Sequence, residues 1–330
     1  MQYRPLGKSG LRVSAVAMGC WAIAGQSVWG SQDEHEALAA IGASLDAGVT
    51  LFDTAEGYGE SERLLARGLG TRRDEALIAS KVSAENLAPD KIRASCENSL
   101  RALQTEQVDL YQMHWPPRDT ALDDAVSTLR DLQAEGKIRI WGVSNFGSGD
   151  LDDLATVGNS GCASNQVIYN LLTRAIEFDV LPRCEKAGIG ILAYSPLAQG
   201  LLTGKFASAD DVPPGRARTR HFRGNRPQAR HGEAGHEAET FAAIAEVKRL
   251  CADANLDMGD VSLAWCLTQG ATSVIAGARN AEQARTNARA ADVVLPPELV
   301  SALNRATDAL KSALGPNLDL WDGAANARSR

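Results

Sequence analysis

Leu51–Ser61, LFDTAEGYGES, is the stretch of sequence that decides the fold we expect. It begins as a short apolar strand that ends in the carboxylate of Asp53, and Tyr58 follows between two glycines. Two further strand-like runs also lead to a polar residue: residues 77–80 to Lys81 and residues 108–113 to His114. An Asp, a Tyr, a Lys and a His, each just past a strand, form a set suited to proton transfer in a parallel α/β protein.

Strand and helix patterns alternate along the rest of the chain. Strands are expected at residues 15–18, 50–52, 76–80, 108–113, 138–143, 163–167, 189–193 and 273–276. Helical patterns lie between the strands, and further helices are expected at about 237–254, 259–269 and 297–311. This alternation predicts an α/β fold, a (β/α)8 TIM barrel with extra helices, preceded by a β-hairpin over residues 2–13. We expect one barrel domain over residues 1–330, with a C-terminal tail at about 312–330, because no linker divides the chain.

The composition predicts a soluble globular protein. Hydrophobic residues make up 44%, charged residues 23%, and the formal net charge of −7 argues against a nucleic acid or an anionic membrane as partner. The six cysteines form no CxxC pair, so we expect them reduced, in the cytoplasm. The apolar run over residues 13–24 is similar to a signal peptide, but Gly19 and Trp21 interrupt it, which favours a strand that leads into a pocket. No stretch is long enough to span a membrane.

Common nucleotide and metal motifs are absent from the sequence. No GxGxxG follows a strand, and Gly204-Lys205 lacks the rest of a P-loop, so neither a Rossmann domain nor a P-loop site is expected. The histidines His221, His231 and His236 have no ligand-like spacing, so no metal site is predicted.

The set Asp53, Tyr58, Lys81 and His114 resembles the catalytic tetrad of the aldo-keto reductases, in the same order along the chain. The resemblance implies that Tyr58 protonates a carbonyl oxygen while a hydride reaches the carbon. A nearby ammonium favours the tyrosinate, so Lys81 would make the proton easier to give. Asp53 would hold Lys81, and His114 would hydrogen-bond the substrate oxygen. Taken singly, each residue is more often a cap, a solvated charge or a structural histidine, and only their joint placement favours catalysis.

Later segments resemble the nicotinamide site of the same family. Trp141–Phe146, Ser164–Gln166 and Ala193–Leu197 are similar to its fifth-, sixth- and seventh-strand motifs, and the resemblance implies NADP(H) as the cofactor. Arg279 is the best match for an arginine at the adenosine 2′-phosphate, and Gln283 stands where some members carry arginine. The implied cofactor-binding residues are Trp21, Asp53, Ser144, Asn145, Gln166, Tyr194, Ser195, Pro196, Leu197, Gln199, Gly200, Lys205, Gly277, Arg279, Gln283 and Asn287.

The expected activity is the NAD(P)H-dependent reduction of an aldehyde or ketone, with sugars among the open substrates. Trp29, Trp115 and Trp321 are expected to line the substrate pocket. The alternative is a nucleotide-sensing regulatory subunit resembling the potassium-channel β-subunits. The Arg-rich segment 216–230 is interpreted as a solvated loop or as a region that attracts a phosphate. The expected partner is a small carbonyl compound, and a homo-oligomer is left open.

Overall fold

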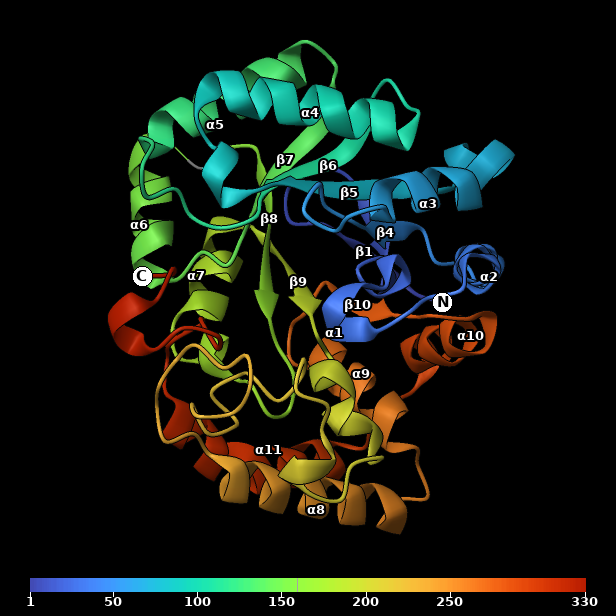
Figure 1. Cartoon of the computed structure of the whole chain (residues 1–330), viewed down its shortest axis with the longest axis vertical. Coiled ribbons are helices and arrows are strands. Elements are labelled where there is room, and N and C mark those ends of the chain that lie inside the picture. The colour runs from blue at the N-terminus through green and yellow to red at the C-terminus, as the bar shows by residue number, and fades with distance from the viewer. Residues whose placement is uncertain (159) are drawn as a thin grey trace.

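Eight parallel strands close into a barrel in the computed structural model, which describes residues 1–158 and 160–330 except for the side chains of residues 26 and 27 (Figure 1). The order around the barrel is β10-β3-β4-β5-β6-β7-β8-β9. The strands are β3 (Val16–Gly19), β4 (Leu51–Asp53), β5 (Leu77–Val82), β6 (Val108–Met113), β7 (Ile138–Ser144), β8 (Cys162–Ile168), β9 (Gly190–Tyr194) and β10 (Ser273–Gly277). The predicted (β/α)8 barrel is therefore confirmed.

Helices surround the barrel and connect its strands (Figure 1). Asp33 begins the first long helix, where its carboxylate accepts a hydrogen bond from the backbone N–H of Glu36. The helices are α1 (Gln26–Trp29), α2 (Glu34–Asp46), α3 (Ser61–Leu69), α4 (Pro89–Leu103), α5 (Leu122–Ala134), α6 (Ser148–Val157), α7 (Val180–Ala187), α8 (Glu237–Asp253), α9 (Met258–Thr268), α10 (Ala281–Arg289) and α11 (Pro297–Leu314).

The predicted hairpin is present and closes one end of the barrel. Its strands β1 (Tyr3–Pro5) and β2 (Arg12–Ser14) pair antiparallel just before β3 begins. The buried side chains of Leu6, Leu11 and Val13 form one apolar cluster with a residue from every barrel strand: Ala17, Leu51, Ala79, Leu110, Ile140, Ala163, Leu192 and Ile275. This packing fills the N-terminal end of the barrel. The opposite end, where the strands finish, is left for a site.

The strands run slightly further than the apolar pattern predicts. Asp53 is the last residue of β4, paired in register with Gly19 and Ala79, and Lys81 lies inside β5 opposite Gln112. This corrects the expectation that Asp53 and Lys81 come just past their strands. The predicted strands at 50–52 and 76–80 stop before the charges of Asp53 and Lys81, but these two charges are buried and paired with each other, so the strands continue through them.

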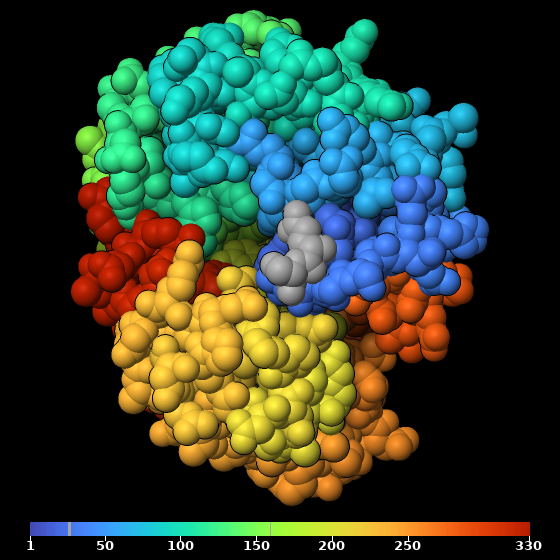
Figure 2. All heavy atoms as spheres, viewed as in Figure 1, coloured from blue at the N-terminus to red at the C-terminus, as the bar shows by residue number. Residues whose placement is uncertain are grey.

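The long segment after β9 and the C-terminal tail meet over the open end of the barrel. The backbone N–H of Arg220 donates to the carbonyl of Leu320 at 2.8 Å. The tail begins after Leu314, because α11 extends to that residue rather than ending before 312 as predicted. Leu318, Leu320 and Trp321 are buried in it. Figure 2 shows a hollow between the red tail, the yellow segment after β9 and the blue N-terminal region.

None of the helices in the described part of the chain combines the length and the hydrophobicity that a membrane crossing requires.

Candidate active site

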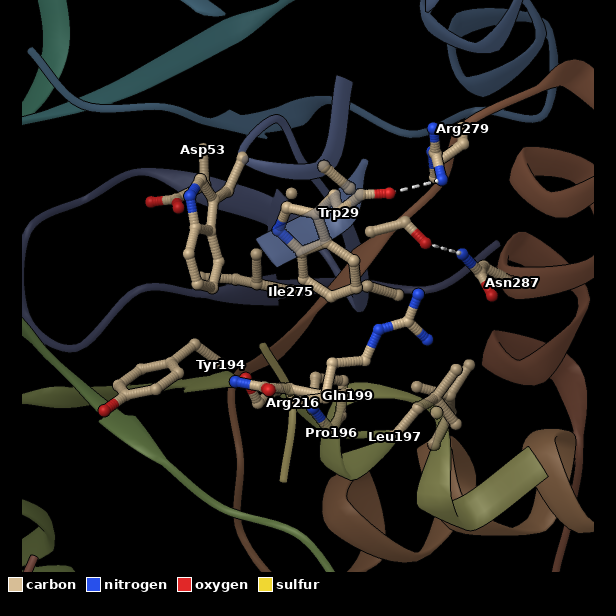
Figure 3. Close-up of a pocket in the computed structure, with 18 of the residues that line it drawn as sticks. Trp29, Asp53, Tyr194, Pro196, Leu197, Gln199, Arg216, Ile275, Arg279 and Asn287 are labelled. Carbon is tan, nitrogen blue, oxygen red and sulfur yellow. Dashed lines mark hydrogen bonds between the residues drawn. The ribbon is translucent and has the colours of Figure 1, made fainter. Parts of the chain in front are cut away.

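A cavity of about 830 Å³ lies at the C-terminal ends of the barrel strands. Its lining includes every residue that the sequence predicted for the catalytic, cofactor and substrate sites except Lys81. Lys81 is fully buried behind the tyrosine that it contacts. The barrel therefore gathers side chains from all along the chain into one pocket, part of which Figure 3 shows in close-up.

The four predicted catalytic side chains lie in contact with one another. The Lys81 ammonium donates to Asp53 Oδ1 at 2.7 Å, to the Thr54 carbonyl at 2.8 Å and to the Tyr58 hydroxyl at 3.3 Å. The Tyr58 hydroxyl is 3.5 Å from His114 Nε2. Because Lys81 and Asp53 are both buried, their charges act on Tyr58 without much screening by water.

The loop after β4 presents the Tyr58 ring between an aromatic ring and the ammonium. Trp21 stacks on Tyr58 with 5.8 Å between ring centroids, and Lys81 Nζ lies 4.7 Å from the Tyr58 centroid. Gly59 has a φ of 59°, a conformation that favours glycine and that lets the chain turn directly after the tyrosine. Trp21 therefore lines the cavity and also contacts Tyr58, the predicted proton donor.

Burial sets the direction of the pKa shift for Tyr58 and His114, whereas attraction to neighbouring groups sets it for Lys81. Burial raises the pKa of Tyr58 above its usual value and outweighs the opposite effect of Lys81, so the tyrosine stays protonated at neutral pH. This net direction is opposite to the one expected from Lys81 alone. Burial by itself would lower the pKa of Lys81, but attraction by Asp53 and Tyr58 raises it. Burial, together with the charges of Lys81 and Arg328, lowers the pKa of His114 to about 3, so its imidazole is neutral.

Hydrogen bonds connect the predicted nicotinamide-binding residues to the predicted catalytic side chains. Gln166 Nε2 donates to the second oxygen of Asp53 at 2.7 Å, and Ser144 Oγ donates to the Gln166 carbonyl at 2.8 Å. The Tyr194 hydroxyl donates to Asn145 Oδ1 at 2.8 Å. Asn145 has a φ of 60°, which is uncommon for a residue other than glycine and is typical of functional sites. These side chains are thus held in fixed directions before any ligand binds.

Cations gather where the segment after β9 meets the loop after β10. Burial and then the nearby charge of Arg216 lower the pKa of Lys205. The Arg216 guanidinium lies 5.2 Å from the Trp29 ring centroid, and Arg279 donates to the Trp29 carbonyl at 2.8 Å. Figure 3 shows Trp29 between these two arginines. Arg279 also donates to Gln32 Oε1 at 2.6 Å, so its guanidinium group is hydrogen-bonded to the segment before α2.

Two features of this region fit a nicotinamide dinucleotide. Arg216 Nε and Gln199 Oε1 are buried and have no hydrogen-bond partner among the described residues, which leaves polar atoms available to a ligand. Asn280 begins α10 by accepting from the Gln283 N–H at 2.9 Å, so the start of a helix, which favours an anion, lies at the cavity wall next to Arg279. Sequence analysis did not single out Arg216. Its only signal was membership of the Arg-rich segment.

The other end of the cavity is walled by aromatic rings. Trp321 lies 6.2 Å from Trp115 edge-on and 6.2 Å from Tyr194 in a stacked arrangement. Trp115 and Trp321 thus lie together, and their place in a substrate pocket stays a prediction. Trp29 does not share their contacts, because its neighbours are Trp21 and the cations near Arg279. All three tryptophans line the same cavity, so a place for Trp29 in the substrate pocket stays a prediction.

The Arg-rich segment is neither a plain solvated loop nor a uniform phosphate site. Arg220 is buried against Glu233, and Arg226 pairs with Glu237 and Asp210. Arg216, Arg218 and Arg230 line the cavity, and so does Arg328 from the tail, which the sequence analysis missed. His221, central to the segment, is buried and contacts the Leu172 carbonyl at 3.0 Å. Within the described residues no group of three or more His, Cys, Asp or Glu side chains is placed to hold a metal ion.

Comparison with known proteins places this geometry in a family context. The model of the aldo/keto reductase family matches residues 15–308, from the start of the barrel into α11. Methylglyoxal reductase YeaE of Escherichia coli is 39% identical over 203 residues, which cover 60% of this chain and 70% of the relative. The NADH-specific methylglyoxal reductase of Escherichia coli is 30% identical over 342 residues, covering 92% of this chain and 100% of the relative. A probable voltage-gated potassium channel subunit beta from Oryza sativa is 30% identical over 325 residues, with 92% and 95% covered.

Solved structures are similar over nearly the whole chain. An aldo-keto reductase from Klebsiella pneumoniae in complex with NADPH has a TM-score of 0.75 at 28% identity, covering 92% of this chain and 95% of that one. The glycerol dehydrogenase from Gluconobacter oxydans has a TM-score of 0.78 at 32% identity, covering 96% of each chain.

Proposed function

Because the chain belongs to the aldo/keto reductase family, we propose that it reduces an aldehyde or ketone to the alcohol with NADP(H), using Tyr58 as the acid. One observation carries the proposal: the Tyr58 hydroxyl lies within 3.3 Å of the Lys81 ammonium and 3.5 Å of His114 Nε2, beside a cavity. A donor in this position can protonate an oxygen that enters the cavity.

The proposed mechanism assigns a separate task to each side chain. Tyr58 is protonated at neutral pH and gives its proton as negative charge develops on the substrate oxygen. The Lys81 ammonium stabilises the tyrosinate that remains, and Asp53 keeps that ammonium charged and in place. His114 is neutral, so its Nε2–H tautomer can donate a hydrogen bond to the same oxygen without competing for the proton. A nicotinamide cofactor, when bound, supplies the hydride.

Three cations support NADP(H) as the cofactor. Lys205, Arg216 and Arg279 line one end of the cavity, where phosphate groups would relieve their mutual repulsion. Gln166, Ser144 and Asn145 would hold the carboxamide, through polar groups that the hydrogen-bond network already orients. A relative named as NADH-specific makes the choice between the two cofactors a matter for direct measurement.

A nucleotide-sensing regulatory subunit is the second candidate, and one relative is named as a probable potassium channel subunit. The contacts of Asp53, Tyr58, Lys81 and His114 favour the reductase, because a binding protein needs no buried ammonium against a tyrosine.

The experiment is a turnover assay with purified protein. NADPH oxidation is followed at the nicotinamide absorbance with methylglyoxal, which two of the relatives are named for, and with butanal and benzaldehyde. We expect turnover of at least one of them. NADPH binding, measured by quenching of tryptophan fluorescence, without turnover of any carbonyl compound would favour the regulatory candidate.

A further inference from the structure

Three guanidinium groups, which we call the arginine cluster (Arg218, Arg230 and Arg328), line the cavity at the end that holds Trp115 and Trp321. Arg328 Cζ lies 3.6 Å from the centroid of the Trp115 ring. Its positive charge also acts on His114, which places the cluster near the catalytic group rather than at the cations of the cofactor side. The cluster therefore faces the space that a substrate would occupy.

Two members of the cluster are neutralised by the tail. Arg328 donates to both oxygens of the buried Asp319, at 2.7 Å and 3.0 Å. Arg230 pairs with Asp322 at 3.1 Å, and Arg328 lies 3.2 Å from the same carboxylate. The two carboxylates are thus already shared by two guanidinium groups.

Arg218 has no such neutralisation. Within residues 1–158 and 160–330 it forms no ion pair, and its Nε is buried without a hydrogen-bond partner. Burial, then the charges of Arg230 and Arg328, lower the pKa of Arg218, yet a guanidinium remains charged at any physiological pH. Three positive charges against two negative ones leave an uncompensated, partly buried cation at the cavity wall. Such a cation is costly unless an anion accompanies it.

Arg216 and Arg218, two residues apart in the same segment, face different parts of the cavity. Arg216 lies over the Trp29 ring, and the charge of Arg279 adds to burial in lowering the pKa of Arg216. For Arg218, the charges that add to burial in lowering the pKa are those of Arg230 and Arg328. The phosphates of a dinucleotide bound beside Arg216 would not neutralise the charge of Arg218. Neutralising Arg218 therefore requires a different anion.

We propose that Arg218, supported by Arg230 and Arg328, binds an anionic group on the substrate, so that the preferred substrates are carbonyl compounds that also carry a carboxylate or a phosphate. The proposal rests on the proposed function. The planar guanidinium fork suits both anions, since each offers two oxygens to parallel N–H donors. The rings of Trp115, Trp321 and Tyr194 would enclose the body of the molecule between this anion and the carbonyl group at Tyr58.

The test compares matched aldehydes. The value of kcat/KM is measured with NADPH for 4-carboxybenzaldehyde and for its neutral methyl ester, methyl 4-formylbenzoate, and likewise for glyceraldehyde 3-phosphate and glyceraldehyde. We expect the charged member of at least one pair to be preferred about tenfold or more, the scale of one charge-assisted hydrogen bond. The carboxylate pair and the phosphate pair distinguish the two anions.

Arg218→Met should reduce that preference ratio at least about tenfold, because it removes the charge while retaining most of the side-chain bulk. Arg249→Met is the matched control: it makes the same change on the exposed face of α8, where Arg249 pairs with Glu246 and Asp253, and should leave the ratio unchanged. Charged members that are no better than their neutral partners in the wild type would overturn the proposal, as would an unchanged ratio in Arg218→Met.

A binding readout separates this proposal from the proposed function. Benzoate is titrated against the intrinsic fluorescence of the protein, in which Trp115 and Trp321 report on the site. Saturable quenching whose dissociation constant for benzoate rises at least about tenfold in Arg218→Met supports the anion site even if no aldehyde is reduced. Absence of quenching by benzoate and by inorganic phosphate in the wild type counts against the anion site even if neutral aldehydes are reduced.

Discussion

Replacing Lys81 by methionine should lower both the stability of the protein and its turnover. A second substitution should restore part of the stability but none of the turnover. The ammonium donates to Asp53 at 2.7 Å, to Thr54 at 2.8 Å and to Tyr58 at 3.3 Å, and its side chain is 0% exposed. Methionine fills similar space but leaves the Asp53 carboxylate, 3% exposed, with Gln166 as its remaining side-chain donor. An uncompensated buried charge of this kind costs about 3–5 kcal/mol.

Adding Asp53→Asn to Lys81→Met removes the stranded charge. The double variant should therefore recover part of the lost stability, giving an interaction free energy of about 2 kcal/mol or more. Turnover should not recover, because neither the neutral amide of asparagine nor the thioether of methionine supplies a positive charge beside Tyr58. We expect the loss in kcat to stay about a hundredfold or greater in the single and the double variant alike.

The assay is urea unfolding of the wild type, both single variants and the double variant, with kcat measured on the same preparations. Lys137→Met makes the same side-chain change at a surface ion pair, in which the half-buried Lys137 contacts Glu97 and Glu135, and should change both quantities far less. Losses in unfolding free energy that simply add within about 0.5 kcal/mol would refute the coupling between Lys81 and Asp53.

Three further predictions concern pH and cofactor choice. With the pKa of His114 lowered to about 3 and that of Tyr58 raised, kcat/KM for reduction should be flat from about pH 5 to 8; an acid limb near pH 6.5 that His114→Gln removes would contradict this. The pKa of His221 is lowered to about 4 by burial, so below about pH 6.5 the unfolded state binds more protons and stability falls as the pH is lowered. In urea unfolding at pH 7, 6 and 5, His221→Gln should make that fall shallower by about 1 kcal/mol per pH unit, and an unchanged slope would count against the assignment. Arg279→Ala should weaken NADPH binding by about 1.5–3 kcal/mol and NADH binding little, as measured by fluorescence quenching; an equal loss for both would show that Arg279 serves the segment around Trp29 instead.

The barrel and the meeting of Asp53, Lys81 and His114 at one end of it could be predicted from the sequence, because regular geometry determines them. Parallel strands end at the same edge, so polar residues at the ends of three apolar runs must converge. Asp53, Lys81 and His114 illustrate this, and only the exact strand ends were wrong by one or two residues. Buried, paired charges such as Lys81 look like strand terminators in a sequence pattern.

The arginines of the cavity wall could not be assigned in the same way. Arg216, Arg218, Arg220 and Arg226 look alike in sequence, yet two face the cavity and two pair with acids elsewhere. Between β9 and α8 the chain forms turns and short 3₁₀ segments, without a long periodic element to fix side-chain directions. Arg328 lies further still along the chain, and only the packing of the tail on the barrel brings it to the pocket.

The most direct test of the central claim is the turnover of Tyr58→Phe. NADPH oxidation is measured with the best aldehyde of the panel, and the dissociation constant of NADPH is measured on the same protein. Tyr3→Phe is the matched control, since Tyr3 is exposed and its hydroxyl donates to the Gly48 carbonyl, away from the cavity. The account predicts that Tyr58→Phe loses about a hundredfold or more in kcat while NADPH affinity and the control remain near wild type. Turnover like that of the wild type in Tyr58→Phe would contradict it.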